Sequence, residues 1–157
     1  MARVLEHLPF QAPVWRSATT HQPHVNVLVI VAKGDCPIYE ADLTPPGKRT
    51  DTSHLNQFVI HTALDLVDEI VWTTQSMYLR QVDKFNELMV SAWVTAGHIR
   101  LMLLHTHRNE DAIGKFFREL NELYTKLLAN PFYEINRPIC SPSFDQKVRQ
   151  AARRHLS

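Results

Sequence analysis

The sequence predicts an α+β domain in which helices cover both faces of a five-stranded antiparallel sheet. Residues 25–32 are β-branched and apolar at both odd and even positions, a pattern typical of a strand covered on both faces. The predicted elements follow the order β-β-α-β-β-β-α-α, with short connections between consecutive strands. Short connections require mostly antiparallel pairing, since parallel neighbours need a long crossover. Helices on both faces are then needed to bury the apolar side chains of the sheet.

Five segments are predicted to form the strands, because each is rich in strand-forming residues and is bounded by turn residues. They are residues 25–32, 38–43, 77–82, 88–95 and 99–105. Gly34 lies in the turn after the first strand, and Ala96-Gly97 forms a tight turn between the last two. The first strand is predicted to lie in the interior of the sheet, because its side chains are apolar on both faces.

The first predicted helix covers residues 53–71, where apolar residues recur at helical spacing. Its predicted buried face consists of Leu55, Phe58, Val59, Thr62, Ala63, Leu66, Val67 and Ile70. Its predicted exposed face carries the polar residues Gln57, His61, Asp65, Asp68 and Glu69. This division predicts that the polar residues take no part in the core.

Two further helices are predicted after the last strand. Asn109 is predicted to cap the first of them, which ends at Asn130-Pro131. Ser141-Pro142 is predicted to open the last helix, with a cap followed by a proline at the first helical position. The inner face of this last helix is predicted to consist of Phe144, Val148, Ala151 and Ala152.

The composition limits the class of protein. The 157 residues are 45% hydrophobic and 21% charged, as in one globular domain. The formal net charge of +1 argues against a dedicated nucleic-acid-binding protein, which would need a basic surface. Two cysteines, Cys36 and Cys140, do not make a disulfide framework, so we expect free thiols in the reducing cytosol. The longest apolar run, residues 27–32, is far shorter than a membrane span, so we expect any membrane contact to be peripheral.

The first 23 residues differ in composition from the rest of the chain. They include Pro9, Pro13 and Pro23, and their apolar residues show no sustained period. We therefore predict an N-terminal extension over residues 1–23 that is poorly ordered, followed by one domain over residues 24–157.

The sequence shows no set of residues typical of a catalytic or cofactor site. The four glycines form no phosphate-binding motif, and no G-x-S-x-G pattern occurs. An alternative is a metalloenzyme in which His105 and His107 hold an ion with Glu110 or Asp111, since alternate strand residues point the same way. No further histidine or cysteine cluster completes a ligand set, and we expect solvated histidines at the end of a strand. The prediction is therefore no catalytic residue, no metal and no cofactor.

Charged residues suggest two candidate interaction surfaces. Asp65, Asp68 and Glu69 lie in the last turns of the first helix, where negative charge opposes the helix dipole. They form either a plain solvated face or a recognition patch for a cationic partner. The last helix carries Lys147, Arg149, Arg153 and Arg154. These cations suit a helix C-terminus, and the alternative is contact with an anionic membrane or an acidic partner.

Dispersed motifs of the chain resemble the sedlin family over about residues 24–157. The motifs are residues 54–58 (HLNQF), 63–69 (ALDLVDE), 77–79 (MYL), 82–87 (VDKFNE), 90–92 (VSA), 94–98 (VTAGH), 130–134 (NPFYE), 144–145 (FD) and 147–148 (KV). Their length and common order make chance similarity an inadequate explanation. The extension over residues 1–23 has no counterpart in the family.

The resemblance implies a longin (profilin-like) fold, with one helix on one face of the sheet and two on the other. It also implies a non-catalytic adaptor of the trafficking protein particle (TRAPP) complex, which tethers vesicles and promotes Rab nucleotide exchange in endoplasmic reticulum-to-Golgi transport. The implied partners are small core subunits and larger complex-specific subunits, with a Rab GTPase and the membrane reached indirectly through the complex. The implied location is cytoplasmic and perinuclear, at the endoplasmic reticulum, the ER–Golgi intermediate compartment and the Golgi.

The resemblance also assigns roles to residues. The family's partner-binding aspartate corresponds to Asp65. We expect the neighbouring polar residues His61, Asp68 and Glu69 to belong to the same partner-binding face. Separately, Ser91 and Leu101 lie in predicted strands and Val148 lies on the inner face of the last helix, so we predict structural roles for these three.

Overall fold

A computed structural model of the chain describes residues 25–45, 53–85, 87–106 and 109–156. The predicted N-terminal extension, residues 1–23, lies outside the described residues. Eight elements are present in the described part, in the predicted order β-β-α-β-β-β-α-α. The α+β prediction is therefore confirmed.

The five strands form one antiparallel sheet. They are β1 (Asn26–Ala32), β2 (Cys36–Asp42), β3 (Tyr78–Phe85), β4 (Leu88–Val94) and β5 (Arg100–His105). Their order across the sheet is β2-β1-β5-β4-β3, and every neighbouring pair is antiparallel. β1 lies between β2 and β5, as its apolar sequence predicts.

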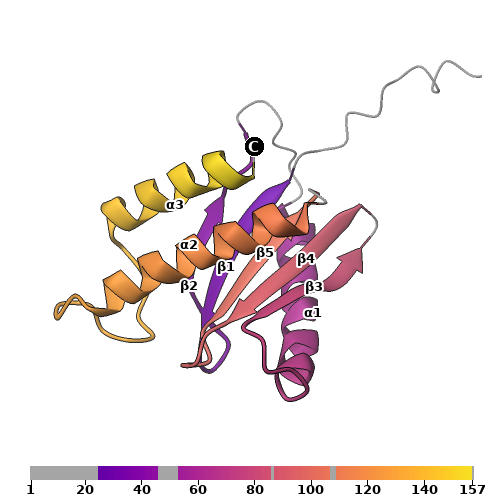
Figure 1. Ribbon diagram of the computed structural model, residues 1–157, viewed down its shortest axis with the longest axis horizontal. Helices are drawn as coiled ribbons and strands as arrows, with labels where there is room; N and C mark the ends of the chain where they lie inside the picture. Colours follow the sequence, from indigo (N-terminus) through magenta and orange to yellow (C-terminus); the bar gives the residue numbers. More distant parts are fainter. Residues whose placement is uncertain (1–24, 46–52, 86, 107–108, 157) are drawn as a thin grey trace, which may run out of the picture.

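The helices are divided between the two faces of the sheet. They are α1 (Ser53–Val71), α2 (Glu110–Leu128) and α3 (Pro142–His155). Figure 1 shows α1 behind the sheet, while α2 and α3 cross its front. The arrangement of one helix on one face and two on the other, expected from the resemblance, is confirmed.

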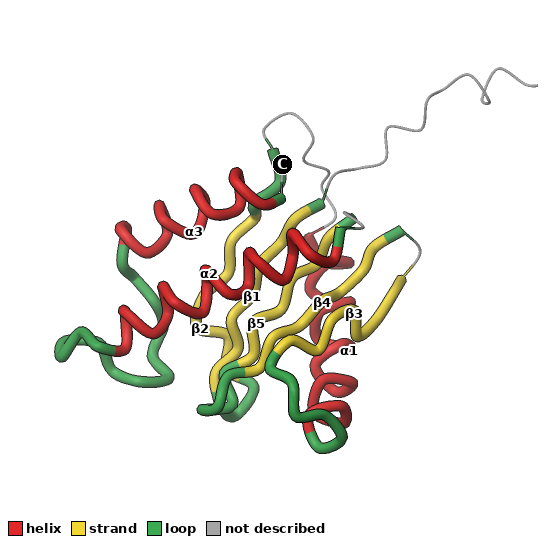
Figure 2. Tube along the Cα trace, in the orientation of Figure 1, coloured by secondary structure: helices red, strands yellow, loops and turns green. Residues whose placement is uncertain are grey.

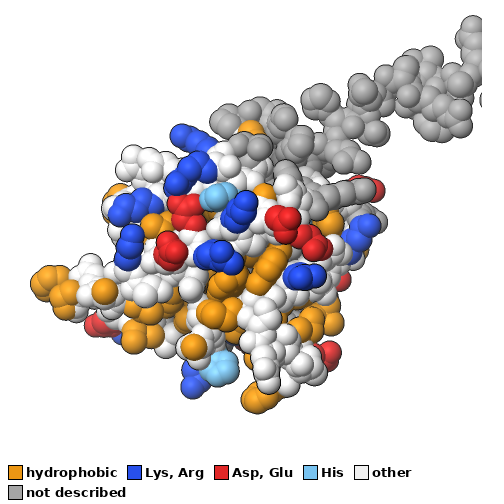
Figure 3. Space-filling view, viewed as in Figure 1, with side chains coloured by type: hydrophobic (Ala, Val, Ile, Leu, Met, Phe, Trp, Pro, Cys, Tyr) orange, Lys and Arg blue, Asp and Glu red, His pale blue; other side chains and the backbone are white. Residues whose placement is uncertain are grey.

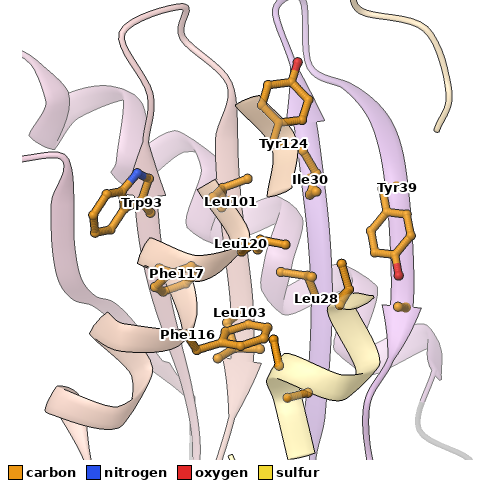
Figure 4. Close-up of a cluster of buried hydrophobic side chains, with 14 of the residues drawn as sticks. Leu28, Ile30, Tyr39, Trp93, Leu101, Leu103, Phe116, Phe117, Leu120 and Tyr124 are labelled. Atoms are coloured by element: carbon orange, nitrogen blue, oxygen red, sulfur yellow. The ribbon is translucent and has the colours of Figure 1, made fainter. Parts of the chain in front are cut away.

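Alternation along the strands separates two hydrophobic cores. In β1, Leu28 and Ile30 point to the core under α2 and α3, while Val27, Val29 and Val31 belong to the core under α1. Figure 4 shows the first core, in which aromatic and leucine side chains of α2 pack on strand residues. Phe116, Phe117 and Leu120 are fully buried there. The two-sided apolarity of β1 thus reflects two separate cores.

The caps of the last two helices lie where the sequence predicts them. The Asn109 side chain accepts a hydrogen bond from the backbone N–H of Ala112 at 3.2 Å. The Ser141 hydroxyl accepts one from the backbone N–H of Phe144 at 3.3 Å. Pro142 follows as the first residue of α3. These bonds satisfy N–H groups that have no partner within the helix.

Two strands are longer than predicted. β2 begins at Cys36, because an irregularity between Ile30 and Val31 lets Pro37 pair with β1. Pro37 is tolerated because β2 is an edge strand. β3 continues to Phe85, which pairs with Leu88 beside the β3–β4 turn. Pairing across the sheet therefore extends strands beyond the stretches of strong strand propensity.

The predicted buried face of α1 is partly wrong. The structure buries Asn56, Val59, Ile60, Ala63, Leu64 and Val67. It leaves Phe58 64% exposed and Leu55 40% exposed, and Thr62 is also exposed. Apolar residues occur around much of this helix, and packing on the sheet selects the side that contains Ile60 and Leu64. Two large apolar side chains consequently remain on the outer surface of α1.

Candidate protein-interaction site

The outer side of α1 carries the acids predicted to bind a partner. His61, Asp65 and Glu69 are all exposed, and their spacing of four residues places them in a row along the helix. Within the described parts of the chain, no ion pair involves any of these three side chains. Their charges and hydrogen-bonding groups face solvent.

Exposed apolar residues extend the same side of α1. Phe58 lies seven residues before Asp65, which is two helical turns along one face. Leu55 lies three residues before Phe58 and is its neighbour on the helix surface. An exposed phenylalanine on the same side of a helix as unpaired carboxylates combines apolar area with a directional charged contact. This combination is typical of a protein-binding surface.

Asp68 has a different environment from the one predicted. Its Oδ1 atom lies 2.7 Å from the Arg100 guanidinium, which also contacts Asp35 Oδ1 at 2.6 Å. Arg100 donates a further hydrogen bond to the Ala32 carbonyl at 3.3 Å. The Arg100 side chain is only 8% exposed, so α1, β5 and the β1–β2 turn are joined by a buried cation. Asp68 thus fixes the end of α1 while one side of its carboxylate stays at the surface.

The sequence analysis did not identify Arg100 and Asp35 as partners in an ion-pair cluster at the end of α1. A detectable signal was present, because Arg100 begins a strand of which the next four residues are apolar. A cation in an interior strand needs carboxylate partners. The sequence could not identify those partners, because Asp35 and Asp68 lie 65 and 32 residues away along the chain.

The three residues with predicted structural roles are all buried. Ser91 is 1% exposed, and its Oγ lies 2.7 Å from His105 Nε2. Leu101 and Val148 are inaccessible and belong to the core under α2 and α3. Figure 4 shows Leu101 between Trp93 and Ile30. The effect of replacing these side chains stays a prediction.

His105 is not the solvated histidine that the sequence analysis expects. It is 2% exposed, because β5 is the central strand and pairs with β1 and β4 as far as His105 itself. His107 lies outside the described residues. Among the residues that the structure describes, no group of three or more His, Cys, Asp or Glu side chains could hold a metal ion. None of the described helices is long and apolar enough to cross a membrane.

The cations of α3 are largely engaged within the domain. Arg149 pairs with Asp145 at 3.0 Å, and Arg154 pairs with Glu119 of α2. Asp145 also accepts a hydrogen bond from the Tyr39 hydroxyl at 2.7 Å, and this bond lowers the pKa of the Asp145 carboxyl. Desolvation opposes that shift and Arg149 adds to it. These contacts join α3 to β2 and α2. They favour a role of the α3 charges within the domain over contact with an anionic membrane or an acidic partner.

A second exposed apolar group, which the sequence interpretation missed, lies in the connection between α2 and α3. Phe132 is 93% exposed and Ile135 is 67% exposed. The Tyr133 hydroxyl donates to the Arg137 carbonyl at 2.8 Å, so the connection has an ordered shape. Figure 3 shows hydrophobic side chains gathered at this projecting end of the molecule. Two apolar groups are therefore exposed on different sides of the domain.

The order of the elements and the division of the helices between the two faces of the sheet define an α+β fold of the longin type. Comparison with protein families shows that the chain belongs to the sedlin family, whose model matches residues 30–154.

Named relatives cover nearly the same region. The chain is 46% identical over 130 residues to the Transport protein particle 20 kDa subunit of Schizosaccharomyces pombe, covering 81% of this chain and 96% of the relative. It is 31% identical to Trafficking protein particle complex subunit 20 of Saccharomyces cerevisiae, covering 82% and 96%. It is 28% identical to Trafficking protein particle complex subunit 2-like protein of Xenopus tropicalis, covering 77% and 91%.

Proposed function

We propose that this chain is a non-catalytic adaptor subunit of a trafficking protein particle complex. In this role it links small core subunits to larger, complex-specific subunits in endoplasmic reticulum-to-Golgi vesicle transport. The names of its relatives support membership of such a complex. A Rab GTPase and the membrane are reached through the other subunits. The proposed location is cytoplasmic and perinuclear, at the endoplasmic reticulum, the intermediate compartment and the Golgi.

The exposed side of α1 is the observation that carries this proposal. Asp65 and Glu69 lie there without an ion pair in the described structure, on the same side of the helix as Phe58. A carboxylate of this kind can accept a charge-assisted hydrogen bond from an arginine or lysine of a partner, worth about 1.5–3 kcal/mol. The exposed Phe58 supplies apolar area two helical turns away on the same side of α1.

The linking role is supported by a second observation. Phe132 and Ile135 lie in the connection after α2, and α2 covers the face of the sheet opposite to α1. An adaptor must contact two partners at once, so it needs two separate surfaces. The exposed apolar side chains on α1 and after α2 provide two such surfaces.

Affinity purification with mass spectrometry tests the proposal. The tagged chain is expected to recover both small and larger subunits of the complex in stoichiometric amounts. The matched variant Phe58→Ala is expected to recover less of one class of subunit, whereas Phe85→Ala, an exposed phenylalanine of edge strand β3, is expected to recover both. Recovery of neither class by the wild-type chain would exclude the proposed function.

A further inference from the structure

The connection between α2 and α3 projects from the domain. It covers residues 129–141, and Figure 2 shows it extending beyond the adjoining ends of both helices. Its most exposed large side chains are Phe132, at 93%, and Ile135, at 67%. Neither belongs to a hydrophobic core, so packing of the domain gives no reason for apolar side chains at these positions. We call these two side chains the turn patch.

A β-turn that contains a proline holds Phe132 at its corner. The Tyr133 N–H donates to the Asn130 carbonyl at 3.1 Å, which closes a turn over residues 130–133. The Asn130 side chain accepts a second hydrogen bond from the Phe132 N–H at 3.0 Å. Asparagine at the first position of a turn and proline at the second are both favoured. The turn therefore keeps its shape without a partner.

A second β-turn holds Ile135. The Arg137 N–H donates to the Glu134 carbonyl at 3.3 Å, and Asn136 has a left-handed φ of 67°, which asparagine tolerates. The Tyr133 hydroxyl donates to the Arg137 carbonyl at 2.8 Å and joins the two turns. An ordered loop loses less conformational entropy on binding than a flexible one does. Both apolar side chains are thus presented on a backbone that is already ordered.

The turn patch lies in a connection that carries no net charge. Glu134 and Arg137 are the only charged residues among residues 129–141, and they pair with each other at 3.1 Å. All of these residues belong to the described part of the chain. An anionic membrane surface binds clusters of unpaired cations, which this connection lacks. Apolar area is therefore what the connection offers to a partner.

A hollow of about 360 Å³ lies beside the turn patch. Leu127, Phe132 and Ile139 contribute apolar side chains to its lining. The surface thus offers one aromatic ring for insertion into a partner and one space that can receive a side chain of that partner. Interfaces of permanent complexes are more apolar than those of transient ones, and their cores are packed as closely as protein interiors.

We infer that the turn patch binds a small core subunit of the complex, in which an uncharged apolar pocket receives Phe132. An apolar side chain of that subunit fills the hollow lined by Leu127 and Ile139. A neutral apolar surface suits a permanently held subunit, whereas the carboxylates of α1 suit the charged contact proposed for larger subunits. This inference rests on the proposed function and assigns one of its two surfaces to one class of partner.

Binding of purified small core subunits to the full chain tests the inference. Phe132→Ala is expected to weaken this binding about tenfold or more, as for aromatic side chains at interface centres, and to bind the larger subunits within about twofold of wild type. Phe85→Ala, which removes a 41% exposed ring from β3, is the matched control and is expected to bind both classes normally. Both variants are expected to unfold at the wild-type temperature, because neither residue lies in a core.

Asn130 tests the role of the preformed turn. Asn130→Ala removes the acceptor for the Phe132 N–H and leaves the side chains of the turn patch in place. It is expected to weaken binding of small core subunits several-fold, because the turn must then be ordered on binding. Asn130→Ser restores an oxygen that can accept this bond and is expected to recover part of the affinity. Normal binding by Asn130→Ala would contradict the role given to the turn.

Cysteine alkylation locates the contact. Cys140 is exposed and lines the hollow, whereas Cys36 is exposed at the start of β2 and does not line it. Bound small core subunits are expected to slow the reaction of Cys140 with N-ethylmaleimide and to leave that of Cys36 unchanged. Equal reaction rates of Cys140 in the free and bound chain would show that the contact lies elsewhere, and the inference would be wrong.

The outcomes distinguish the two proposals. If the wild-type chain binds both classes of subunit and Phe132→Ala does so equally well, the inference is wrong and the proposed function stands. If the wild-type chain binds neither class, the proposed function fails and the inference fails with it. If Phe132→Ala instead loses binding to larger subunits, to phosphatidylserine-containing vesicles or to a second copy of the chain, the turn patch has another occupant and the inference is overturned.

Discussion

Leu101 illustrates how burial determines the contribution of a single residue to the stability of this domain. It lies on the central strand β5 and is inaccessible to solvent. Its side chain packs in the core under α2 and α3, among residues contributed by several strands and helices. A polar substitution here would remove apolar contacts and bury a hydroxyl group.

We predict that Leu101→Ser lowers the free energy of unfolding by about 2–4 kcal/mol. Urea unfolding followed by circular dichroism measures the change. The matched control is Leu128→Ser, since Leu128 is 39% exposed and its replacement is expected to change stability by no more than about 0.5 kcal/mol. Equal effects of the two substitutions would show that burial of Leu101 does not determine its contribution.

The bond between Tyr39 and Asp145 predicts a dependence of stability on pH. The Tyr39 hydroxyl lowers the pKa of Asp145, so the folded protein binds the proton less readily than the unfolded chain does. The resulting stabilisation is fully present above the usual pKa of an aspartate, about 4, and is lost as pH falls through the lower pKa of the folded state.

Tyr39→Phe removes this bond and keeps the aromatic ring against Phe144. Its destabilisation, measured by urea unfolding at a series of pH values, is expected to be largest above pH about 4 and to shrink in stronger acid. A destabilisation that stays constant over this range would mean that the Tyr39 hydroxyl does not act through the Asp145 carboxylate.

At the scale of elements, α1 shows what sequence periodicity can and cannot determine. The period of apolar residues correctly predicted a helix over residues 53–71. It did not determine which side would be buried, because apolar residues occur on more than one side. Packing against β1, β4 and β5 buries Ile60 and Leu64, and it leaves Phe58 exposed.

The candidate site was predictable to a similar extent. Polar residues such as Asp65 could be placed on the exposed side, since charge is rarely buried without a partner. The contacts of Arg100 with Asp35 and Asp68 could not be predicted from the sequence, because they join segments that are distant along the chain. The exposure of Trp72 could not be predicted either, since the burial of a residue after a helix depends on which segments pack around the helix end.

Contact between α2 and β3 depends on a glycine. A Cβ atom at Gly114 would lie 3.1 Å from Cε1 of Tyr78, whose hydroxyl donates to the Glu110 carbonyl at 3.1 Å. We predict that Gly114→Val destabilises the domain by about 1–3 kcal/mol, because the larger side chain must displace the tyrosine ring. Thermal unfolding measures this change.

The control for this substitution is Gly97→Val. A Cβ atom at Gly97 would meet only Thr95 Oγ1, at 3.9 Å, so this variant is expected to unfold close to the wild-type temperature. If Gly114→Val is as stable as the wild-type chain, Tyr78 does not require the close approach to α2.

Attachment of α3 depends on its inner face. Val148 is inaccessible within the core, so Val148→Asp would bury a charge for which the described structure provides no cationic partner. We predict a loss of several kcal/mol, or failure to fold, by thermal and urea unfolding. Lys147→Asp, one residue earlier on the exposed side of α3, is the control and is expected to fold normally.

At the scale of the whole molecule, the residues that form the cores differ from the exposed residues that we propose for partner binding. Two cores, one on each face of the sheet, bury the side chains that stabilise the domain. The outer side of α1 and the connection after α2 carry exposed apolar side chains that these cores do not need. The proposed adaptor role is compatible with this separation, because partner contacts could then be lost without loss of the fold.

Asp65→Tyr tests this separation most directly. The exposed carboxylate lies near the C-terminal end of a helix and contributes little to stability, so the variant is expected to unfold within about 0.5 kcal/mol of the wild-type chain. In the same preparation, binding to small core subunits is expected to persist, and binding to the larger complex-specific subunits is expected to be lost or strongly weakened. Unfolding of the domain by Asp65→Tyr, or normal binding of both classes of subunit, would contradict the account.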